Sequence, residues 1–143
     1  MVQTQKTLPE RNDTLKVRGM MIEDMVTASG EISIKEAIGL LHHKHIGSVI
    51  VADKNRKCEG IFTERDAIRV IATDVPLSTP LKEVMTRNLK TVREDATFAH
   101  ANRIMNSYNI RHLPVVDEQG CIKGLLSLRA ILDELFNVPT VTG

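Results

Sequence analysis

A threonine and an aspartate three positions apart, Thr63 and Asp66, form the pattern in this sequence that is best suited to bind a polar ligand. Such a pair is typical of a helix start, where the hydroxyl caps the first turn and the acid complements the helix dipole. The same place leaves free N–H groups beside a carboxylate that can accept hydrogen bonds from both hydroxyls of a ribose. The pattern therefore indicates either an ordinary helix cap or a nucleoside site.

Two further groups of residues carry side chains that could do chemistry. Arg111 and His112 combine a planar fork of donors with a second donor, which suits phosphate oxygens, although a solvated pair at a strand edge would look the same. His42, His43 and His45 are metal-ligand types, but no cysteine or paired acid lies near them in the sequence. We therefore expect an exposed helix end at the histidines and no metal site.

The composition excludes several classes of protein. Of the 143 residues, 42% are hydrophobic and 26% charged, and the net charge of +1 gives no field that favours nucleic acid or an anionic membrane. The apolar runs are too short to span a bilayer, and the polar first ten residues do not resemble a secretion signal. Two cysteines, Cys58 and Cys121, are too few for a disulfide framework. We expect a soluble cytoplasmic protein.

The elements that must position these residues occur twice. A shift of 64 residues aligns 27–72 with 91–136 without a gap. Few positions are identical, Gly60 and Gly124 among them, but the apolar runs, turns and helix starts match in order. A unit of about 60 residues buries too little apolar surface alone. We therefore expect two copies packed face to face in one module.

Each copy is predicted to contain a strand, a helix, two strands and a second helix. In the first copy, Ser33 and Glu36 have capping-box form and open a helix, and 49–52 is a β-branched strand. The next strand begins at 60–62, and a helix runs from Thr63 to about Ala72.

The second copy follows the same pattern. Apolar residues at helical spacing predict a helix near 98–108, and 113–116 reads as a strand. Pro114 has no N–H, so we expect it at a strand start, at an edge or in a bulge.

The remaining segments divide the chain. Residues 1–16 are polar and aperiodic and are expected to form a mobile N-terminal tail, followed by a first domain at 17–75 and a second at 80–139. The stretch 73–80 contains two prolines among small polar residues, which is a linker composition.

Two sequence motifs within these repeated elements resemble those of a known family: Gly60-Ile-Phe-Thr-Glu-Arg-Asp66 and Ile110-Arg-His-Leu-Pro-Val-Val-Asp117. With this order of elements they resemble a tandem pair of cystathionine-β-synthase (CBS) domains, a Bateman module, and 81–86 is similar to the lead-in that often precedes a copy. The resemblance covers roughly 17–137. It implies an α+β fold of two β-α-β-β-α motifs packed with pseudo-twofold symmetry, with clefts that bind AMP, ADP, ATP, S-adenosylmethionine or related compounds.

The resemblance also implies roles for individual residues. Asp66 would bind the ribose, and the Thr63 hydroxyl would support the ribose or phosphate. Arg111 and His112 would reach from the second copy to the phosphates of the same ligand. The base would contact residues of the first copy, namely Thr27, Ile32, Ala37, Ile46 and Ser48.

The second copy departs from this pattern. Ser127 keeps the cap position, but Ala130 replaces the acid, and Gly47 and Ser48 stand where the second copy has Arg111 and His112. Both losses fall on the same cleft, so we expect one nucleotide per chain.

The sequence therefore favours a stand-alone regulatory, energy-sensing module that binds an adenine nucleotide and signals to a partner protein. We expect no enzyme activity, because the chain has no Walker loop, nucleophile elbow or paired catalytic carboxylates. The alternative is an interaction or scaffold module that binds S-adenosylmethionine or no ligand. The resemblance also implies a homodimer formed through apolar residues of the second helices, which are Ala67, Ile68, Ile71, Ile131, Leu132 and Leu135.

Overall fold

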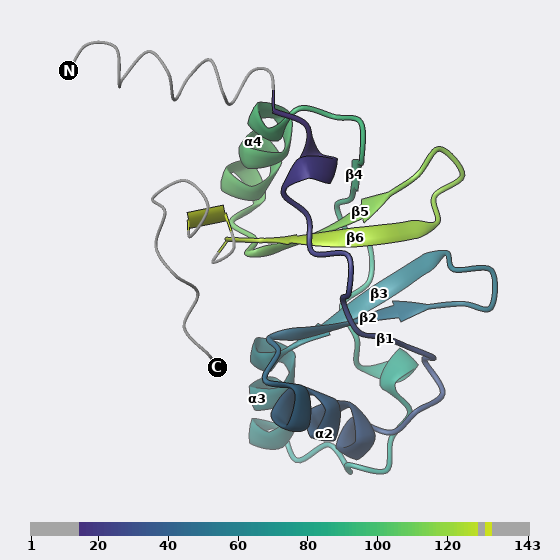
Figure 1. The fold of residues 1–143 in the computed structure, drawn as a ribbon. Helices are drawn as coiled ribbons and strands as arrows, with labels where there is room; N and C mark the ends of the chain where they lie inside the picture. Colours follow the sequence, from purple (N-terminus) through teal and green to yellow (C-terminus); the bar gives the residue numbers. More distant parts are fainter. Residues whose placement is uncertain (1–14, 129–130, 133–143) are drawn as a thin grey trace. The chain divides into compact units, whose positions relative to one another are not determined.

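The computed structural model describes residues 15–128 and 131–132, which group into two compact units (Figure 1). Among these residues, unit 1 contains 15–23, 90–119 and the residues after 122, whereas unit 2 contains 24–89 and 120–122. Each unit has its own three-stranded sheet and its own hydrophobic core.

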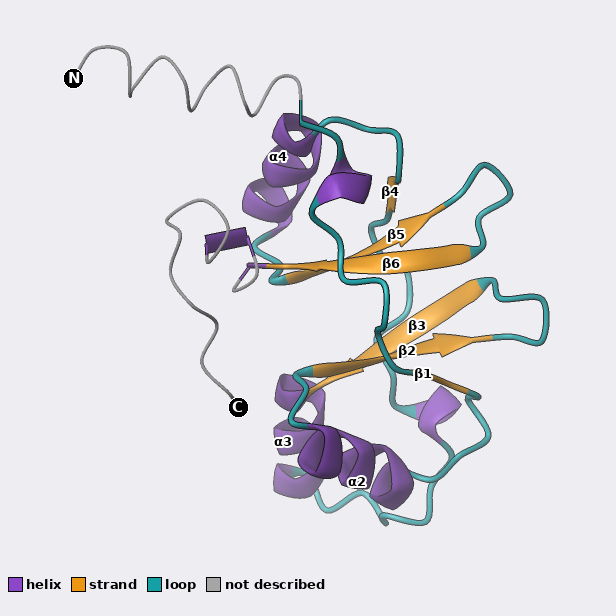
Figure 2. Ribbon diagram, in the orientation of Figure 1, coloured by secondary structure: helices purple, strands orange, loops and turns teal. Residues whose placement is uncertain are grey.

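Unit 2 has a mixed sheet covered by two helices. The strands β1 (Thr27–Ala28) and β2 (Ser48–Ala52) are parallel, and β3 (Cys58–Thr63) runs antiparallel to β2. The helices α2 (Ile34–Lys44) and α3 (Glu64–Ala72) lie on one face of this sheet (Figure 2). Because β2 carries four consecutive buried residues, the strand is covered on both of its faces.

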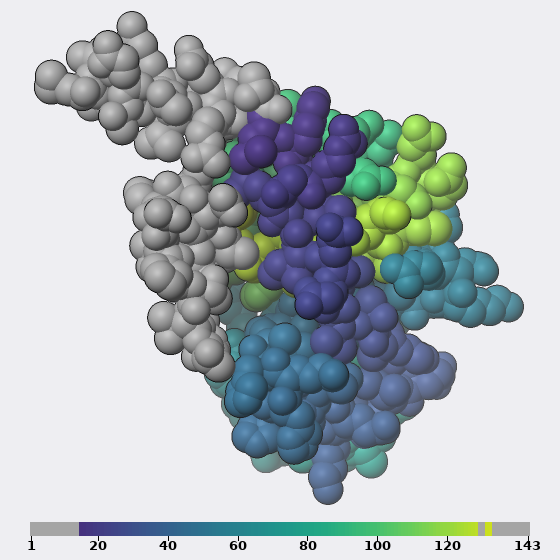
Figure 3. Space-filling model, in the orientation of Figure 1, coloured from purple at the N-terminus to yellow at the C-terminus, as the bar shows by residue number. Residues whose placement is uncertain are grey.

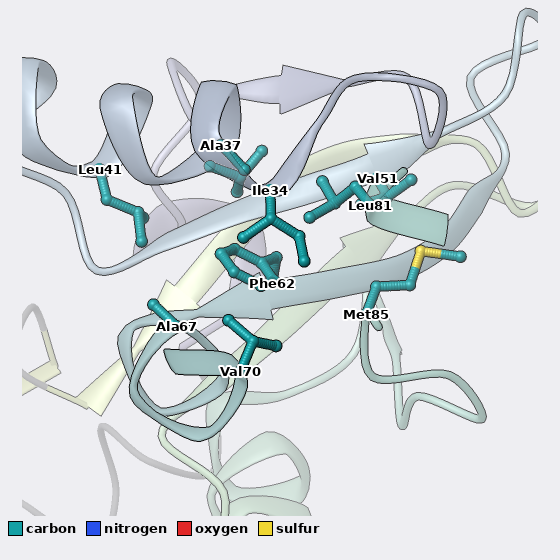
Figure 4. Close-up of a cluster of buried hydrophobic side chains, with 10 residues drawn as sticks. Ile34, Ala37, Leu41, Val51, Phe62, Ala67, Val70, Leu81 and Met85 are labelled. Atoms are coloured by element: carbon teal, nitrogen blue, oxygen red, sulfur yellow. The ribbon is translucent and has the colours of Figure 1, made fainter. Parts of the chain in front are cut away.

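The core of unit 2 lies between the helices and the sheet. Phe62 of β3 is fully buried there, with Ile34 of α2 and Val70 of α3 on either side (Figure 4). Leu81 and Met85 complete the cluster from the segment that follows α3. A buried phenylalanine contributes most of its large apolar surface to such a core.

Unit 1 repeats the arrangement with later residues. The strands β4 (Val92–Arg93) and β5 (His112–Val116) are parallel, and β6 (Ile122–Ser127) completes the sheet beside β5. The helix α4 (Phe98–Tyr108) begins at the cap residue Thr97, whose hydroxyl accepts a hydrogen bond from the His100 amide. The side chains of Phe98, Ala101 and Met105 from α4 line the core.

The two repeats exchange their lead-in segments. The 3₁₀ helix η1 (Val17–Gly19) precedes the first repeat but packs in the core of unit 1, and Figure 3 shows these purple residues beside green and yellow ones. The equivalent helix η2 (Leu81–Glu83) precedes the second repeat and packs in the core of unit 2. Each spatial unit is therefore one repeat together with the lead-in of the other.

The predicted α+β class and the predicted elements of both repeats are confirmed where the structure describes them. Pro114 occupies the third position of the middle strand, β5, but β4 pairs only with Val115 and Val116. The proline therefore sits where β5 has no β4 neighbour, which is the edge-like position expected of a residue without an N–H.

The structure covers only the last two residues of the predicted tail, so the mobility of the tail stays a prediction. Residues 1–14 lie outside the described residues, but the Leu15 carbonyl accepts a hydrogen bond of 2.7 Å from the Phe98 amide, and Val17 is fully buried. Ordered packing therefore begins before the first repeat. The predicted trailing end, 137–143, and most of the second helix of the second repeat, including Leu135, also lie outside the described residues.

Candidate functional site

The candidate site lies at the start of α3, where Thr63 and Asp66 form a capping box. The Asp66 amide donates to the Thr63 hydroxyl at 3.2 Å, and the Thr63 amide donates to Oδ2 of Asp66 at 2.9 Å. Thr63 ends β3 and is itself extended, so the chain turns from strand to helix at this residue. The predicted cap is confirmed, and it fixes the Asp66 carboxylate beside the first turn of the helix.

The Asp66 carboxylate is buried, with 7% of the residue exposed. Two side chains outside the cap also bind it. The Thr86 hydroxyl lies 3.1 Å from Oδ1, and Nη2 of Arg69 lies 3.3 Å from the same oxygen. A buried carboxylate is stable only when its oxygens accept hydrogen bonds or face a cation, and here both conditions are met. The site therefore presents a fixed anionic acceptor that suits vicinal hydroxyls.

The strands beside α3 bring part of the predicted base-binding set near this carboxylate. Ser48 is buried and pairs with Thr63 across the β2–β3 ladder, and the Gly47 carbonyl accepts a hydrogen bond from the Glu64 amide. Ile46 is half-buried and directly precedes these two residues. The structure thus gathers Ile46 and Ser48 at the end of the sheet where α3 starts.

The other predicted base contacts have different surroundings. Ala37 is fully buried in the core of unit 2 and presents no surface to a ligand in this structure. Ile32 is half-buried against the same core, and its carbonyl accepts a hydrogen bond from the Leu81 amide. Thr27 is exposed on β1 and pairs with Ile50.

The predicted phosphate-binding residues belong to unit 1. Arg111 is exposed and directly precedes β5, and His112 is the half-buried first residue of that strand. The Arg111 carbonyl accepts a hydrogen bond from the Leu128 amide, so its backbone is held at the end of β6. Their reach toward a ligand on Asp66 stays a prediction.

The corresponding place in the second repeat begins at Ser127, the last residue of β6. Ala130, which replaces the acid, lies outside the described residues. The residue type alone distinguishes Ala130 from Asp66, because a methyl group accepts no hydrogen bond.

A surface cavity of about 680 Å³ lies elsewhere on unit 2, between the turn after β2 and the segment after η2. Its walls carry Lys54, Lys82 and Arg87 together with Glu31 and Asp53. Lys82 lies 2.8 Å from Glu31, and this hydrogen bond raises the pKa of the exposed lysine. None of the predicted site residues lines the cavity.

The remaining sequence candidates are on the surface or isolated. His42 and His43 are exposed in the last turn of α2, and His45 ends that helix in the left-handed conformation, with φ at 53°. No cluster of three or more metal-ligating side chains occurs among the residues that the structure describes. In the same part of the chain, none of the helices has the length and apolarity needed to cross a bilayer.

Sequence reasoning missed two residues at the site, Thr86 and Arg69. Thr86 lies 20 residues from Asp66 in a segment that no helical or strand periodicity marks, so no local pattern points to the contact. A comparison of equivalent positions in the internal repeat gives a signal that could have identified these two residues. At the equivalent positions of unit 1, the lead-in of the first repeat has Ile22 in place of Thr86, and the second repeat has Asp133 in place of Arg69.

Comparison with known proteins agrees with this geometry. The model of the CBS domain family matches the chain twice, over residues 17–73 and 81–137. The inosine-5′-monophosphate dehydrogenase of Aquifex aeolicus is 37% identical over 128 residues, which are 89% of this chain but 26% of that enzyme. The chain thus spans about a quarter of that curated relative.

Two solved structures cover most of the chain. An uncharacterized conserved protein from Pyrococcus horikoshii has a TM-score of 0.80 at 27% identity and covers 92% of this chain and 98% of its own. The CBS domain pair of protein MJ0100, in complex with 5′-methylthioadenosine and S-adenosyl-L-methionine, has a TM-score of 0.77 at 31% identity. That match covers 85% of this chain and 95% of the other.

Proposed function

The chain belongs to the CBS domain family and contains two copies of the domain, and on this premise we propose that it is a regulatory module that binds an adenosyl compound at Asp66. The observation that carries the proposal is the buried Asp66 carboxylate at the start of α3, with oxygens that suit the two hydroxyls of a ribose. The similar CBS pair of protein MJ0100 binds two ligands that both contain adenosine. Adenosine is therefore the shared ligand chemistry.

Within this class we favour an adenine nucleotide, AMP, ADP or ATP, over a sulfur-containing adenosyl compound. Arg111 and His112 supply donors that suit phosphate, and Arg111 is exposed. The alternative remains an interaction or scaffold module that binds S-adenosylmethionine or no ligand. Because Ala130, Gly47 and Ser48 offer the other cleft neither an acid nor a basic side chain, one ligand per chain is expected.

The first experiment tests Asp66. Titration calorimetry with AMP, ADP, ATP, S-adenosylmethionine and 5′-methylthioadenosine is compared between the parent protein and Asp66→Ala. Loss of charge-assisted bonds to the ribose should weaken binding by about 1.5–3 kcal/mol for each bond. Glu64→Ala removes an exposed acid from the same helical turn and should bind like the parent. Equal affinity of Asp66→Ala and the parent would refute the assignment.

The second experiment separates the phosphate role from the sugar role. Replacing Arg111 by alanine should weaken AMP and ATP by about tenfold or more but leave adenosine nearly unchanged, because adenosine has no phosphate. An Arg111→Ala variant that loses adenosine and AMP alike would contradict this placement of the phosphates. Preferential binding of S-adenosylmethionine by the parent would support the alternative.

The module is proposed to act on another protein rather than to catalyse a reaction. The similarity to the dehydrogenase of Aquifex aeolicus takes in only 26% of that enzyme, so it gives no support for dehydrogenase activity in this chain. Incubation with ATP and analysis for a product tests this directly. Regulation by a bound nucleotide then requires an effector protein that contacts the module.

A homodimer is part of the proposal. Ile68 and Ile71 lie three positions apart on α3 and are 70% and 59% exposed, and Leu132 is 44% exposed. Ala67 and Ile131, by contrast, are buried in the cores of their own units and are not available for a dimer contact. Exposed isoleucines in adjacent turns gain stability when a second copy covers them. A monomeric mass in light scattering at micromolar concentration would exclude the dimer.

A further inference from the structure

The two oxygens of the Asp66 carboxylate differ in their main partners, although the Thr86 hydroxyl lies within reach of both, at 3.1 Å from Oδ1 and 3.3 Å from Oδ2. Oδ2 accepts from the amide and the hydroxyl of Thr63, at 2.9 and 3.2 Å, and both bonds belong to the helix cap. Oδ1 accepts from the Thr86 hydroxyl at 3.1 Å and from Nη2 of Arg69 at 3.3 Å. A carboxylate offers about four acceptor positions, so these bonds use its capacity. A ligand that binds this carboxylate must therefore displace a present partner.

Both partners of Oδ1 connect it to the lead-in segment, residues 81–86. Thr86 ends this segment, and Nη2 of Arg69 also donates to the Val84 carbonyl at 2.8 Å. The backbone of the segment pairs with β3, because Ile61 and Thr86 exchange two hydrogen bonds of 3.1 and 2.9 Å. The lead-in segment is thus held to β3 by its backbone and to Asp66 by side chains.

Unit 1 keeps the equivalent backbone contact, but its sequence has neither the acid nor the hydroxyl that form the side-chain contacts. There Ile22 and Leu125 exchange two hydrogen bonds of 2.7 and 3.0 Å, at the positions of Thr86 and Ile61. The repeat register pairs Asp66 with Ala130, Thr86 with Ile22, and Arg69 with Asp133. A lead-in segment can therefore pair with its strand without the polar network of Asp66, Thr86 and Arg69. The network occurs in the unit that has the acid.

We propose that the lead-in segment and the ligand compete for Oδ1 of Asp66. This inference rests on the proposed function, in which the hydroxyls of the ligand's sugar bind that carboxylate. The cap bonds hold Oδ2, so the incoming hydroxyls replace the Thr86 hydroxyl and Arg69 at Oδ1. Binding then removes the side-chain bonds between Asp66 and the lead-in segment, which keeps its backbone bonds to β3 and the core packing of Leu81 and Met85. The lead-in segment thus has two states, one bonded to Asp66 and one released from it. A ligand that binds more tightly in the released state increases the population of that state.

The route of this effect follows the chain. The lead-in segment is continuous with residues 90–93, which enter unit 1 and form β4. Occupancy of a site on unit 2 thereby alters the segment through which the chain leaves that unit. Thr86 is exposed, so its hydroxyl can exchange Asp66 for water at little cost when the ligand arrives.

Calorimetry with AMP and 5′-methylthioadenosine tests the competition. Thr86→Val removes the competing hydroxyl and should bind the probes roughly tenfold more tightly than the parent. Thr86→Ser restores a hydroxyl and should restore the parent affinity. Thr91→Val, an exposed threonine of unit 1, is the matched control and should not differ from the parent. Unchanged or weaker binding by Thr86→Val would overturn the proposal.

Amide hydrogen exchange at Thr86 and Ile61 measures how firmly the lead-in segment is held, both without and with the probes. Thr86→Val should exchange faster than the parent at both amides, and the probes should speed exchange in the parent to a similar level. If the parent binds neither probe, the proposed function fails and the competition fails with it. If the parent binds but its exchange at these amides slows or stays constant, only the competition is wrong.

Discussion

Replacement of Gly60 by alanine should destabilise the protein, because the lead-in segment packs directly against this glycine. A Cβ at Gly60 would lie 2.7 Å from Sδ of Met85 and 2.8 Å from the Thr86 carbonyl oxygen. The methionine side chain can turn away, but the carbonyl belongs to the backbone and bonds to the Ile61 amide at 3.1 Å. The substitution therefore forces the lead-in segment away from β3.

The size of the effect follows from these contacts. To reach ordinary van der Waals separation, the Thr86 carbonyl must retreat by roughly half an ångström or more, which stretches its bond with Ile61 to the limit of a hydrogen bond. Overpacking typically costs about 1–3 kcal/mol and a lost hydrogen bond about 1 kcal/mol. Alanine also lowers the conformational entropy of the unfolded chain, which offsets about 0.4–1 kcal/mol of this loss. We expect a net loss of about 1–3 kcal/mol in the free energy of unfolding.

Urea denaturation followed by circular dichroism measures this loss as a midpoint lowered by roughly 1 M. Gly39→Ala is the matched control, because a Cβ there meets nothing closer than a ring carbon of His43 at 4.0 Å and the position lies inside α2. This control should be more stable than the parent by about 0.5–1 kcal/mol. A Gly60→Ala variant as stable as the parent would show that the lead-in segment does not hold its place on β3.

Two further measurements follow from local contacts. Ser33→Ala removes the hydroxyl that accepts from the Glu36 amide at 3.0 Å, so the free energy of unfolding should fall by about 1 kcal/mol in urea titrations, and an unchanged value would contradict the capping role. Burial raises the pKa of the Cys58 thiol above its ordinary value, so iodoacetamide at pH 8 should modify Cys58 more slowly in the folded than in the urea-unfolded protein, as followed by peptide mass spectrometry. Because the folded protein holds this proton more tightly, the contribution of Cys58 to stability should fall as pH rises through the unfolded thiol pKa of about 8.5.

The sequence allowed prediction of the features that depend on neighbours in the chain. The capping residues Ser33 and Thr63 mark two helix starts, and both capping boxes form. The β-branched run in 49–52 predicts a strand, because such residues favour the extended backbone, and the structure has β2 there. The 64-residue register also predicts that the second repeat reproduces the fold of the first, which the sheet of unit 1 does.

The contacts of Asp66 could not be predicted in the same way. Thr86 reaches Asp66 because η2 packs Leu81 and Met85 into the core of unit 2, and this packing depends on tertiary contacts rather than local propensity. The exchange of lead-in segments could not be predicted either. The composition of 73–80 indicates a linker between the repeats, but it does not indicate in which unit the following segment packs. Val17 is predicted to open the first domain, but no local pattern indicates that it packs in the core of unit 1.

The exchanged lead-in segments separate the boundary of the repeat from the boundary of the folded body. A fragment that ends at residue 75 contains one full repeat but lacks Leu81, which is fully buried, and Met85, so a gap would open beside Phe62. A fragment of residues 24–89 keeps the whole cluster of that core. Any transfer of one repeat to another protein must therefore carry the start of the next repeat with it. For an ancestral protein made of one such repeat, the same requirement would be met by a second chain that lends its own lead-in.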